Sequence, residues 1–165
     1  LQSLQSPVEQ WFKPLAYALI LLREQGTPCV FYPSMYEAKY VDKQNEEEIY
    51  IELSRLHNLE QMLKVRKNLA FGLQRDFFDH SNTIGWTREG IDEKDKSGCA
   101  VLLTNGSAGN KFMEVGKRHA GKLFVEIAHG HPAKVTINEE GWGDFHVDDK
   151  SVTVWIAADA LRYLY

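Results

Sequence analysis

The sequence has no hydrophobic run long enough to cross a membrane. Its longest run, residues 15–22, has 8 residues and is flanked by charged side chains, whereas a spanning helix needs about 20 apolar residues. An excess of basic residues is also absent, because 19 Lys and Arg stand against 23 Asp and Glu. Proteins that bind nucleic acid or anionic membranes carry basic patches. We therefore expect neither kind of partner.

Cysteine is scarce as well. The chain has 2 cysteines, Cys29 and Cys99, and each sits in an apolar run, where a buried reduced thiol is the usual state. This favours a reducing compartment, and we expect a cytoplasmic protein. No basic-then-apolar leader precedes the first helical pattern. Because the chain opens on Leu1 rather than Met, we also expect it to be a fragment of a longer protein.

What the sequence does contain is the composition of a folded domain. Its 165 residues are 44% hydrophobic and 25% charged, with a net charge of −4, which is typical of globular proteins. Residues 8–24 have apolar side chains on more than one helical face, after a capping box at Ser6, Pro7 and Glu9. Residues 28–32 form a short continuous apolar run that predicts a strand buried on both faces. We expect a loop over 36–48 and an amphipathic helix over 47–70.

The pattern after Gly72 is that of strands. Short apolar segments alternate with turn signals, and they lie at 77–78, 83–87, 99–104, 111–115, 122–127, 134–137, 144–147 and 151–156. Asn105-Gly106 is a hairpin signal, and Val152, Val154 and Ile156 alternate with other residues as in a half-buried antiparallel strand. We predict a mainly β fold in which eight strands form an antiparallel Greek-key sandwich.

The two patterns divide the chain near residue 70. Residues 71–165 can fold as a sandwich, whereas residues 1–70 contain two helices and one strand. A single strand leaves its backbone hydrogen-bonding groups without partners. We therefore expect the partner strands of residues 28–32 to lie outside this chain.

Two clusters contain side chains that bind metals. His129 and His131 could bring two imidazoles to a transition metal, but Gly130 and Pro132 make a turn the favoured interpretation. A second cluster contains Asp76, Asp79, His80 and Asn82, and side-chain oxygens at such spacing can hold calcium. Such residues also form exposed turns, which is the interpretation we favour. The acidic runs 46–48 and 92–96 are interpreted as solvated loops.

Aromatic side chains provide candidate surfaces for stacking on sugar rings. The candidates are Trp11, Trp86, Trp142, Trp155, Tyr32, Tyr36 and Tyr40. Packing is the alternative, and we favour it for Trp11 and Trp155. Trp142, between Gly141 and Gly143 in an expected turn, is the candidate carbohydrate-binding residue. Asn105-Gly106-Ser107 matches a glycosylation sequon but is also the expected turn. No catalytic motif appears in its required context, so we assign no catalytic and no metal-binding residue.

Several longer segments resemble one enzyme family in a consistent order. Residues 11–18 (WFKPLAYA) and 23–33 (REQGTPCVFYP) resemble the seventh helix and eighth strand of the α-amylase barrel, in the liquefying bacterial and cytoplasmic subgroup of glycoside hydrolase family 13. Five later segments resemble domain C, the C-terminal sandwich of the same enzymes. They are residues 78–80 (FDH), 84–90 (IGWTREG), 115–122 (VGKRHAGK), 141–145 (GWGDF) and 151–155 (SVTVW). The resemblance implies a (β/α)₈ barrel followed by domain C, with residues 1–70 as the end of the barrel and 71–165 as domain C.

The resemblance also implies an activity. Such enzymes cleave internal α-1,4-glucosidic bonds of starch, glycogen or maltodextrins with retention, using two carboxylates. By resemblance, the catalytic acids lie on barrel strands 4, 5 and 7, before Leu1. We therefore expect this chain alone to be inactive and domain C to be structural, packing on the remainder of the barrel. The alternative is a non-catalytic glucan-binding module.

The sequence departs from the family at a calcium site. Liquefying relatives bridge the barrel and domain C with calcium held by acidic residues, and the matching positions here are Ser81, Asn82 and Asn105. Neutral side chains offset calcium dehydration poorly, so we predict that this site is lost and that the chain has no cofactor. Residues 32–34 (YPS) also replace the usual Tyr-Gly-acid after strand 8.

Finally, the helix expected at residues 8–24 has apolar residues on more than one face, which predicts self-association of the chain through residues 1–70.

Overall fold

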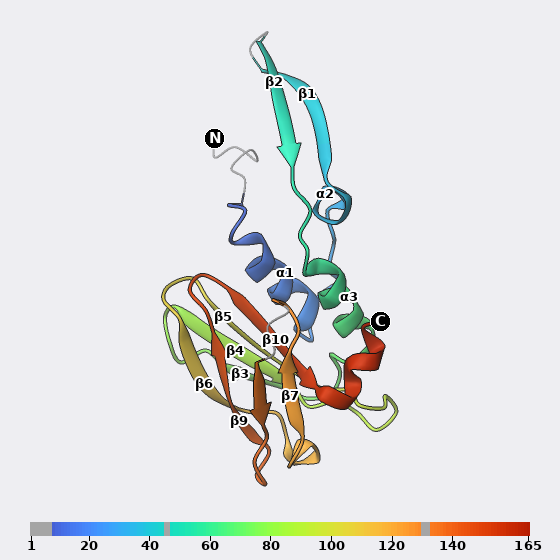
Figure 1. Ribbon diagram of the computed structural model, residues 1–165, viewed down its shortest axis with the longest axis vertical. Coiled ribbons are helices and arrows are strands. Elements are labelled where there is room, and N and C mark those ends of the chain that lie inside the picture. Colours follow the sequence, from blue (N-terminus) through green and yellow to red (C-terminus); the bar gives the residue numbers. More distant parts are fainter. Residues whose placement is uncertain (1–7, 45–46, 130–132) are drawn as a thin grey trace.

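The computed structural model describes residues 8–44, 47–129 and 133–165, which form a β-sandwich covered by helices on one side (Figure 1). A six-stranded sheet has the order β3-β4-β5-β10-β7-β8, and a two-stranded sheet contains β6 and β9. All strand pairs are antiparallel. This confirms the predicted mainly β, antiparallel fold. The strands are β3 (Gln74–Phe77), β4 (Thr83–Arg88), β5 (Cys99–Thr104), β6 (Gly109–Glu114), β7 (Leu123–Glu126), β8 (Lys134–Thr136), β9 (Trp142–Val147) and β10 (Val152–Ala157).

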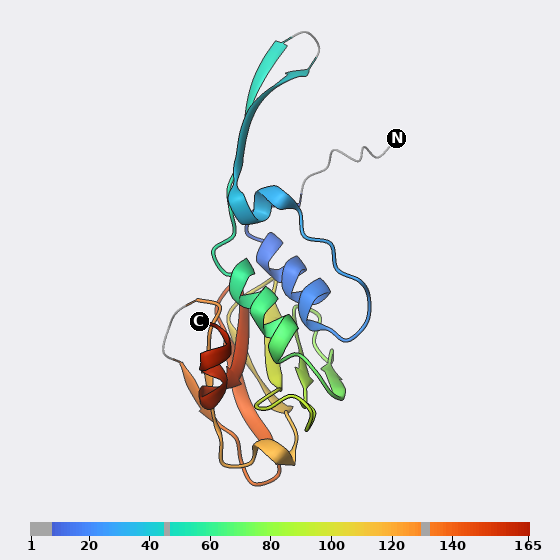
Figure 2. The same cartoon turned by 90° about the vertical axis from the view of Figure 1, so that its right-hand side faces the viewer.

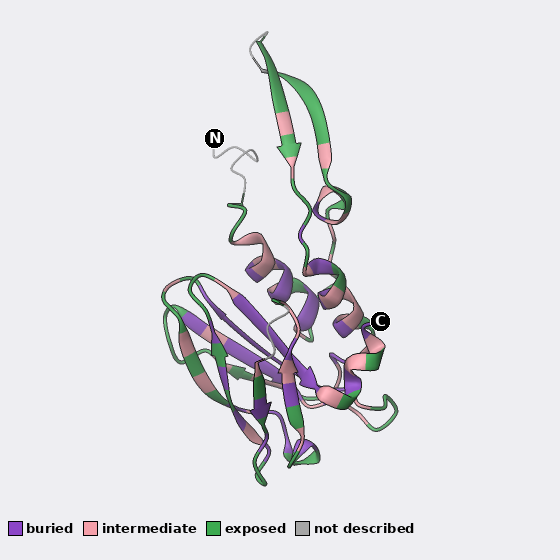
Figure 3. Ribbon diagram, in the orientation of Figure 1, coloured by how far each residue is buried: buried purple, intermediate pink, exposed green. Residues whose placement is uncertain are grey.

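Two helices cover the outer face of the large sheet. Helices α1 (Lys13–Leu22) and α3 (Leu59–Asn68) lie side by side against it (Figure 2). The β6–β9 pair covers the opposite face, so β5 and β10 are buried along their whole length (Figure 3). The predicted half-buried alternation in β10 is therefore wrong, because protein layers cover both faces of this strand.

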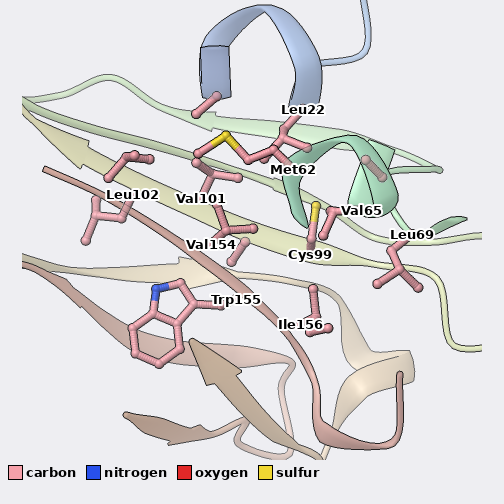
Figure 4. Close-up of a cluster of buried hydrophobic side chains, with 14 of the residues drawn as sticks. Leu22, Met62, Val65, Leu69, Cys99, Val101, Leu102, Val154, Trp155 and Ile156 are labelled. Carbon is pink, nitrogen blue, oxygen red and sulfur yellow. The ribbon is translucent and has the colours of Figure 1, made fainter. Parts of the chain in front are cut away.

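The helices and the sandwich share one hydrophobic core. Leu22 of α1 and Met62 of α3 are fully buried against the sheet, and Trp155 fills the space on the other side of β10 (Figure 4). Trp155 packs edge-on against Phe145 of β9 with ring centroids 5.6 Å apart. Residues on both sides of position 70 therefore stabilise the same packed interior.

The segment between the two helices differs from the expectation. Residues 28–31 are in no helix or strand, and α2 (Tyr32–Tyr36) follows, so the strand predicted at 28–32 is wrong. Among the described residues no strand pairs with this segment. The expected loop at 36–48 and the first part of the expected helix at 47–70 instead form a projecting hairpin of β1 (Ala38–Gln44) and β2 (Glu47–Leu53). Alternation of Ile49 and Ile51 with Tyr50 has the period of a strand.

Two predicted boundaries also change. Helix α1 begins at Lys13, so it is shorter than the predicted 8–24, and Ser6 and Pro7 of the expected capping box lie outside the described residues. The hairpin predicted at Asn105-Gly106 is wrong, because β5 pairs with β4 and β10 while β6 pairs with β9. Both edges of β5 are occupied, so the chain crosses to the other sheet at this turn. Short 3₁₀ helices η1 (Lys117–His119) and η2 (Ala158–Tyr163) complete the fold.

Candidate functional site

The acidic cluster near the start of the sandwich consists of separate ion pairs. Asp76 of β3 accepts two hydrogen bonds from Arg23, at 3.1 and 2.9 Å, while Asp79 pairs with Lys111. His80 Nδ1 accepts hydrogen bonds from the backbone N–H groups of Asn82 and Thr83, both at 3.1 Å. These contacts agree with the favoured interpretation of an exposed turn. Within the described ranges, no three His, Cys, Asp or Glu side chains are grouped so as to hold a metal ion.

The positions that resemble the calcium site of the family do not fit a calcium ion. Asn82 and Asn105 are exposed, and the Asn105 N–H donates to the Asn82 carbonyl oxygen at 3.2 Å. The adjacent hollow, about 520 Å³, contains one carboxylate, that of Asp79, which the Lys111 ammonium neutralises. Calcium requires six to eight oxygen ligands, usually with several carboxylates. This donor set therefore does not favour calcium.

A buried carboxylate lies at the end of β7. Glu126 accepts hydrogen bonds from the N–H groups of Ala128 at 2.6 Å and His129 at 3.0 Å, and His129 Nδ1 is 3.8 Å from its carboxylate. The hydrogen bonds to His129 and to backbone N–H groups lower the pKa of Glu126 although its burial opposes this, and the same carboxylate raises the pKa of His129. The second imidazole of the suggested metal pair, His131, lies outside the described residues.

A buried histidine, His119, has no role in the predicted sites. His119 of η1 is fully buried, and its Nε2–H donates to the Glu89 carbonyl oxygen at 2.7 Å. Its Nδ1 atom is buried without a hydrogen-bond partner. Burial lowers the pKa of His119 to about 4, so the imidazole is neutral at pH 7. The hydrogen bond from His119 to the Glu89 carbonyl oxygen fixes the loop between β4 and β5.

An apolar cleft is open beside α1. Its volume is about 610 Å³, and Ile20, Phe31, Tyr40 and Leu53 are among its lining residues. Ile20 is 42% exposed and Phe31 is 60% exposed. The Tyr17 hydroxyl connects α1 to the segment that contains Phe31 and Ser34. It donates to Ser34 Oγ at 3.0 Å and accepts from the Phe31 N–H at 3.2 Å.

The two cysteines differ in environment. Cys99 is buried in β5, as expected, and burial raises the pKa of its thiol to about 12. Cys29 lines the cleft beside α1 and is exposed. The predicted burial of Cys29 is therefore wrong, because Val30 of the same apolar run packs against the core while Cys29 and Phe31 line the open cleft.

The aromatic candidates have different surroundings. Trp86 and Trp155 are fully buried, whereas Trp11 is 38% exposed. Tyr32, Tyr36 and Tyr40 are exposed around the hairpin. Trp142 begins β9 rather than lying in a turn, and it is partly buried. The Asn138 side chain fixes this start of β9 by accepting the Trp142 N–H at 2.8 Å.

The neighbours of Trp142 include a residue that sequence analysis missed. Phe112 of β6 stacks on Trp142 with ring centroids 5.2 Å apart and an interplanar angle of 21°. Phe77 of β3 approaches it edge-on, with a centroid distance of 6.0 Å. Phe112 is 54% exposed. The alternation of Asn110, Phe112 and Glu114 indicated one strand face, but pairing with β9 is a long-range contact.

Comparisons with known proteins match this chain to α-amylases. Residues 99–156 match the family described as Alpha-amylase C-terminal. The chain is 47% identical over 155 residues to an α-amylase of Geobacillus stearothermophilus, covering 94% of this chain and 27% of that enzyme. An α-amylase of Bacillus licheniformis is 47% identical over 156 residues, with coverage of 94% and 29%. A cytoplasmic α-amylase of Escherichia coli (strain K12) is 40% identical over 162 residues, with coverage of 98% and 32%. The chain thus spans less than a third of the length of these curated relatives.

Proposed function

The chain belongs to the α-amylase family, and we propose that it is the non-catalytic C-terminal part of an enzyme that hydrolyses internal α-1,4-glucosidic bonds of starch, glycogen or maltodextrin with retention. The observation that carries this proposal is the match of 94–98% of the chain to 27–32% of such enzymes. Residues 1–70 would be the end of the catalytic barrel and residues 71–165 domain C. The role of domain C is to pack on the remainder of the barrel.

The charged residues of the chain support a non-catalytic role. A retaining glycosidase needs one carboxylate nucleophile and one protonated acid about 5 Å apart beside the substrate. Glu89 and Glu114 come together on Arg75, at 2.7 and 3.3 Å from its guanidinium nitrogens. The two carboxylates therefore share one cation, and this ion pair is a structural contact that joins β3, the end of β4 and β6.

The cleft beside α1 is the surface we assign to the remainder of the barrel. It is lined mainly by apolar side chains, and Lys13 is the one charged residue among its described lining residues. Burial of a few hundred Å² of apolar surface stabilises an interface by several kcal/mol, at about 25 cal/mol per Å². The segment 28–31 borders the same cleft. The Phe31 N–H donates to the Tyr17 hydroxyl, whereas the backbone groups of Cys29 and Val30 have no hydrogen-bond partner among the described residues. Docking would therefore bring barrel strands next to backbone groups that need partners.

A chimeric enzyme tests the packing role. In the G. stearothermophilus α-amylase, the matched segment is replaced by this chain, and hydrolysis of soluble starch is measured after incubation at increasing temperatures. We expect an active chimera that Ile20→Asp inactivates, because an unpaired buried carboxylate destabilises an interface by several kcal/mol. Gln25→Asp, which adds the same charge to an exposed turn, is the matched control.

The isolated chain distinguishes docking from misfolding. Because Ile20 is 42% exposed there, Ile20→Asp should change the free energy of unfolding of the isolated chain by no more than about 0.5 kcal/mol. An inactive unsubstituted chimera that is folded would contradict the assignment. So would equal thermal inactivation of the Ile20→Asp and Gln25→Asp chimeras.

Three further properties belong to the same proposal. The similarity to a cytoplasmic α-amylase of E. coli supports a cytoplasmic location. The replacement of acidic ligands by Ser81, Asn82 and Asn105 supports an enzyme without the calcium that bridges the barrel and domain C in liquefying relatives. The exposed apolar lining of the cleft supports self-association of the isolated chain. Within the described residues, no helix is long and apolar enough to cross a membrane.

A further inference from the structure

The β1–β2 hairpin follows the segment 28–31 and precedes helix α3. Segment 28–31 runs toward the hairpin, whereas α1 and α3 both run away from it (Figures 1 and 2). In a (β/α)₈ barrel, the loops that connect each strand to the following helix lie on one face, and this face carries the active site. Under the proposed function, on which this inference rests, the hairpin therefore belongs to the catalytic face of the enzyme.

The two faces of the hairpin differ in character. Residues that lie opposite each other in the strand register share a face, so Tyr40 shares one with its partner Ile51 and with Leu53, two residues further along β2. Tyr40 and Leu53 also line the apolar cleft beside α1. This face is therefore continuous with the surface that we assign to the remainder of the barrel.

The opposite face carries an aromatic ring next to an ion pair. Tyr50 lies opposite Val41, and Lys39 lies opposite Glu52 on the same face, with Lys39 Nζ 2.8 Å from Glu52 Oε1. None of these four residues is among the described residues that line the cleft. Tyr50 is 63% exposed and Val41 is 58% exposed. Docking of the barrel on the cleft thus leaves this face of the hairpin free for a ligand.

From this arrangement we infer that Tyr50, Lys39 and Glu52 form a wall of the substrate cleft, and that Tyr50 determines specificity for the length of the α-1,4-glucan. A pyranose ring has an apolar face of C–H groups that fits an aromatic ring, while its hydroxyls can donate to a carboxylate and accept from an ammonium group. The side chains of Lys39 and Glu52 are 49% and 53% exposed. Both charged groups therefore keep free hydrogen-bonding capacity for a sugar.

The length of the hairpin places this contact at a sugar unit away from the cleaved bond. Each strand has 7 residues, which corresponds to a length of about 23 Å, and Tyr50 is about 10 Å along β2 from Leu53 at the base. Catalytic groups lie at the ends of the barrel strands, below the projecting hairpin. A contact made equally with the bound substrate and with the transition state lowers KM without changing kcat. Tyr50 should therefore favour long glucans through KM.

The chimeric enzyme described above tests this role, because it carries the hairpin on a complete barrel. Initial rates are measured on amylose and on a short chromogenic maltotrioside. Tyr50→Ala should raise the KM for amylose about tenfold, since the ring contact is lost, while kcat stays the same and the maltotrioside, which does not reach the hairpin, is hydrolysed at the same rate. Tyr50→Phe, which keeps the ring, should retain the original KM. Tyr165→Ala removes an aromatic side chain that is 98% exposed and is the matched control.

A second variant separates the ring contact from the folding of the hairpin. Tyr50→Thr removes the ring but keeps a residue that favours strands, so it should raise the KM for amylose as much as Tyr50→Ala does, at an unchanged temperature of thermal inactivation. An unchanged KM for amylose in both variants, or an equal loss of kcat/KM on both substrates, would overturn the inference while the chimera remains active. An inactive unsubstituted chimera would instead contradict the proposed function, and the inference with it.

Discussion

Buried His119 should make this protein sensitive to mild acid. Its Nε2–H is used by the Glu89 carbonyl oxygen, and its Nδ1 atom is buried without a partner. Protonation would add an N–H donor with no acceptor and a charge in the core. The pKa of His119 is therefore about 4 in the folded chain, compared with 6.5 for an unperturbed imidazole.

The sign of the pH dependence follows from these two values. Between pH 6.5 and pH 4 the unfolded chain binds a proton at this residue and the folded chain does not, so the free energy of unfolding falls as pH falls. The expected loss between pH 7 and pH 5 is roughly 2 kcal/mol, and it reaches about 3 kcal/mol below pH 4, where the loss stops growing.

A difference measurement isolates this residue from the other titrating groups. Urea unfolding is followed by tryptophan fluorescence at pH 7 and pH 5 for the unsubstituted chain and for His119→Gln, whose amide N–H can still donate to Glu89. We expect the variant to lose about 2 kcal/mol less between the two pH values. His57→Gln, at an exposed position, is the control. Equal losses in the unsubstituted chain and His119→Gln would refute the reasoning.

Three other predictions concern the core, the metal and the assembly. Met62→Ala, at a fully buried position of α3, should destabilise the chain by about 2–5 kcal/mol in a single transition seen by both circular dichroism and tryptophan fluorescence; separate transitions would show that α3 and the sandwich do not share a core. The melting temperature should be the same in EDTA and in millimolar calcium, because Ser81, Asn82 and Asn105 supply no carboxylate; a clear rise with calcium would show that the site persists. Light scattering at micromolar concentration should give a mass of at least a dimer, since the apolar cleft beside α1 is open; a monomeric mass would contradict this.

The strands of the sandwich could be predicted because local signals specify them. Turn residues separate the apolar runs, and all eight predicted segments overlap observed strands. The burial of β10 could not be predicted in the same way. Thr153 looks like a solvent-facing residue, but its hydroxyl donates to the carbonyl oxygens of His146 at 2.9 Å and Leu102 at 3.3 Å. A polar residue with satisfied hydrogen bonds can be buried, so alternation does not reveal a covered face.

The segment before the sandwich was harder to predict because its contacts are long-range. Residues 28–31 have the composition of a buried strand, but no strand pairs with them in the described part of the chain. The β1–β2 hairpin has a two-residue period at Ile49 and Ile51 that the nearby helical pattern concealed. The candidate site shows a similar limit. Flanking glycines identified Trp142, whereas Phe112 becomes visible as its partner only when β6 and β9 pair.

Release of reducing sugar from soluble starch shows whether the catalytic carboxylates lie outside this chain. The isolated chain and its chimera with the G. stearothermophilus α-amylase are assayed side by side at equal molar concentration. The isolated chain should release no more sugar than buffer, while the chimera should release sugar and form products of retained anomeric configuration. Hydrolysis by the isolated chain would contradict it, because the catalytic carboxylates would then have to lie within these 165 residues.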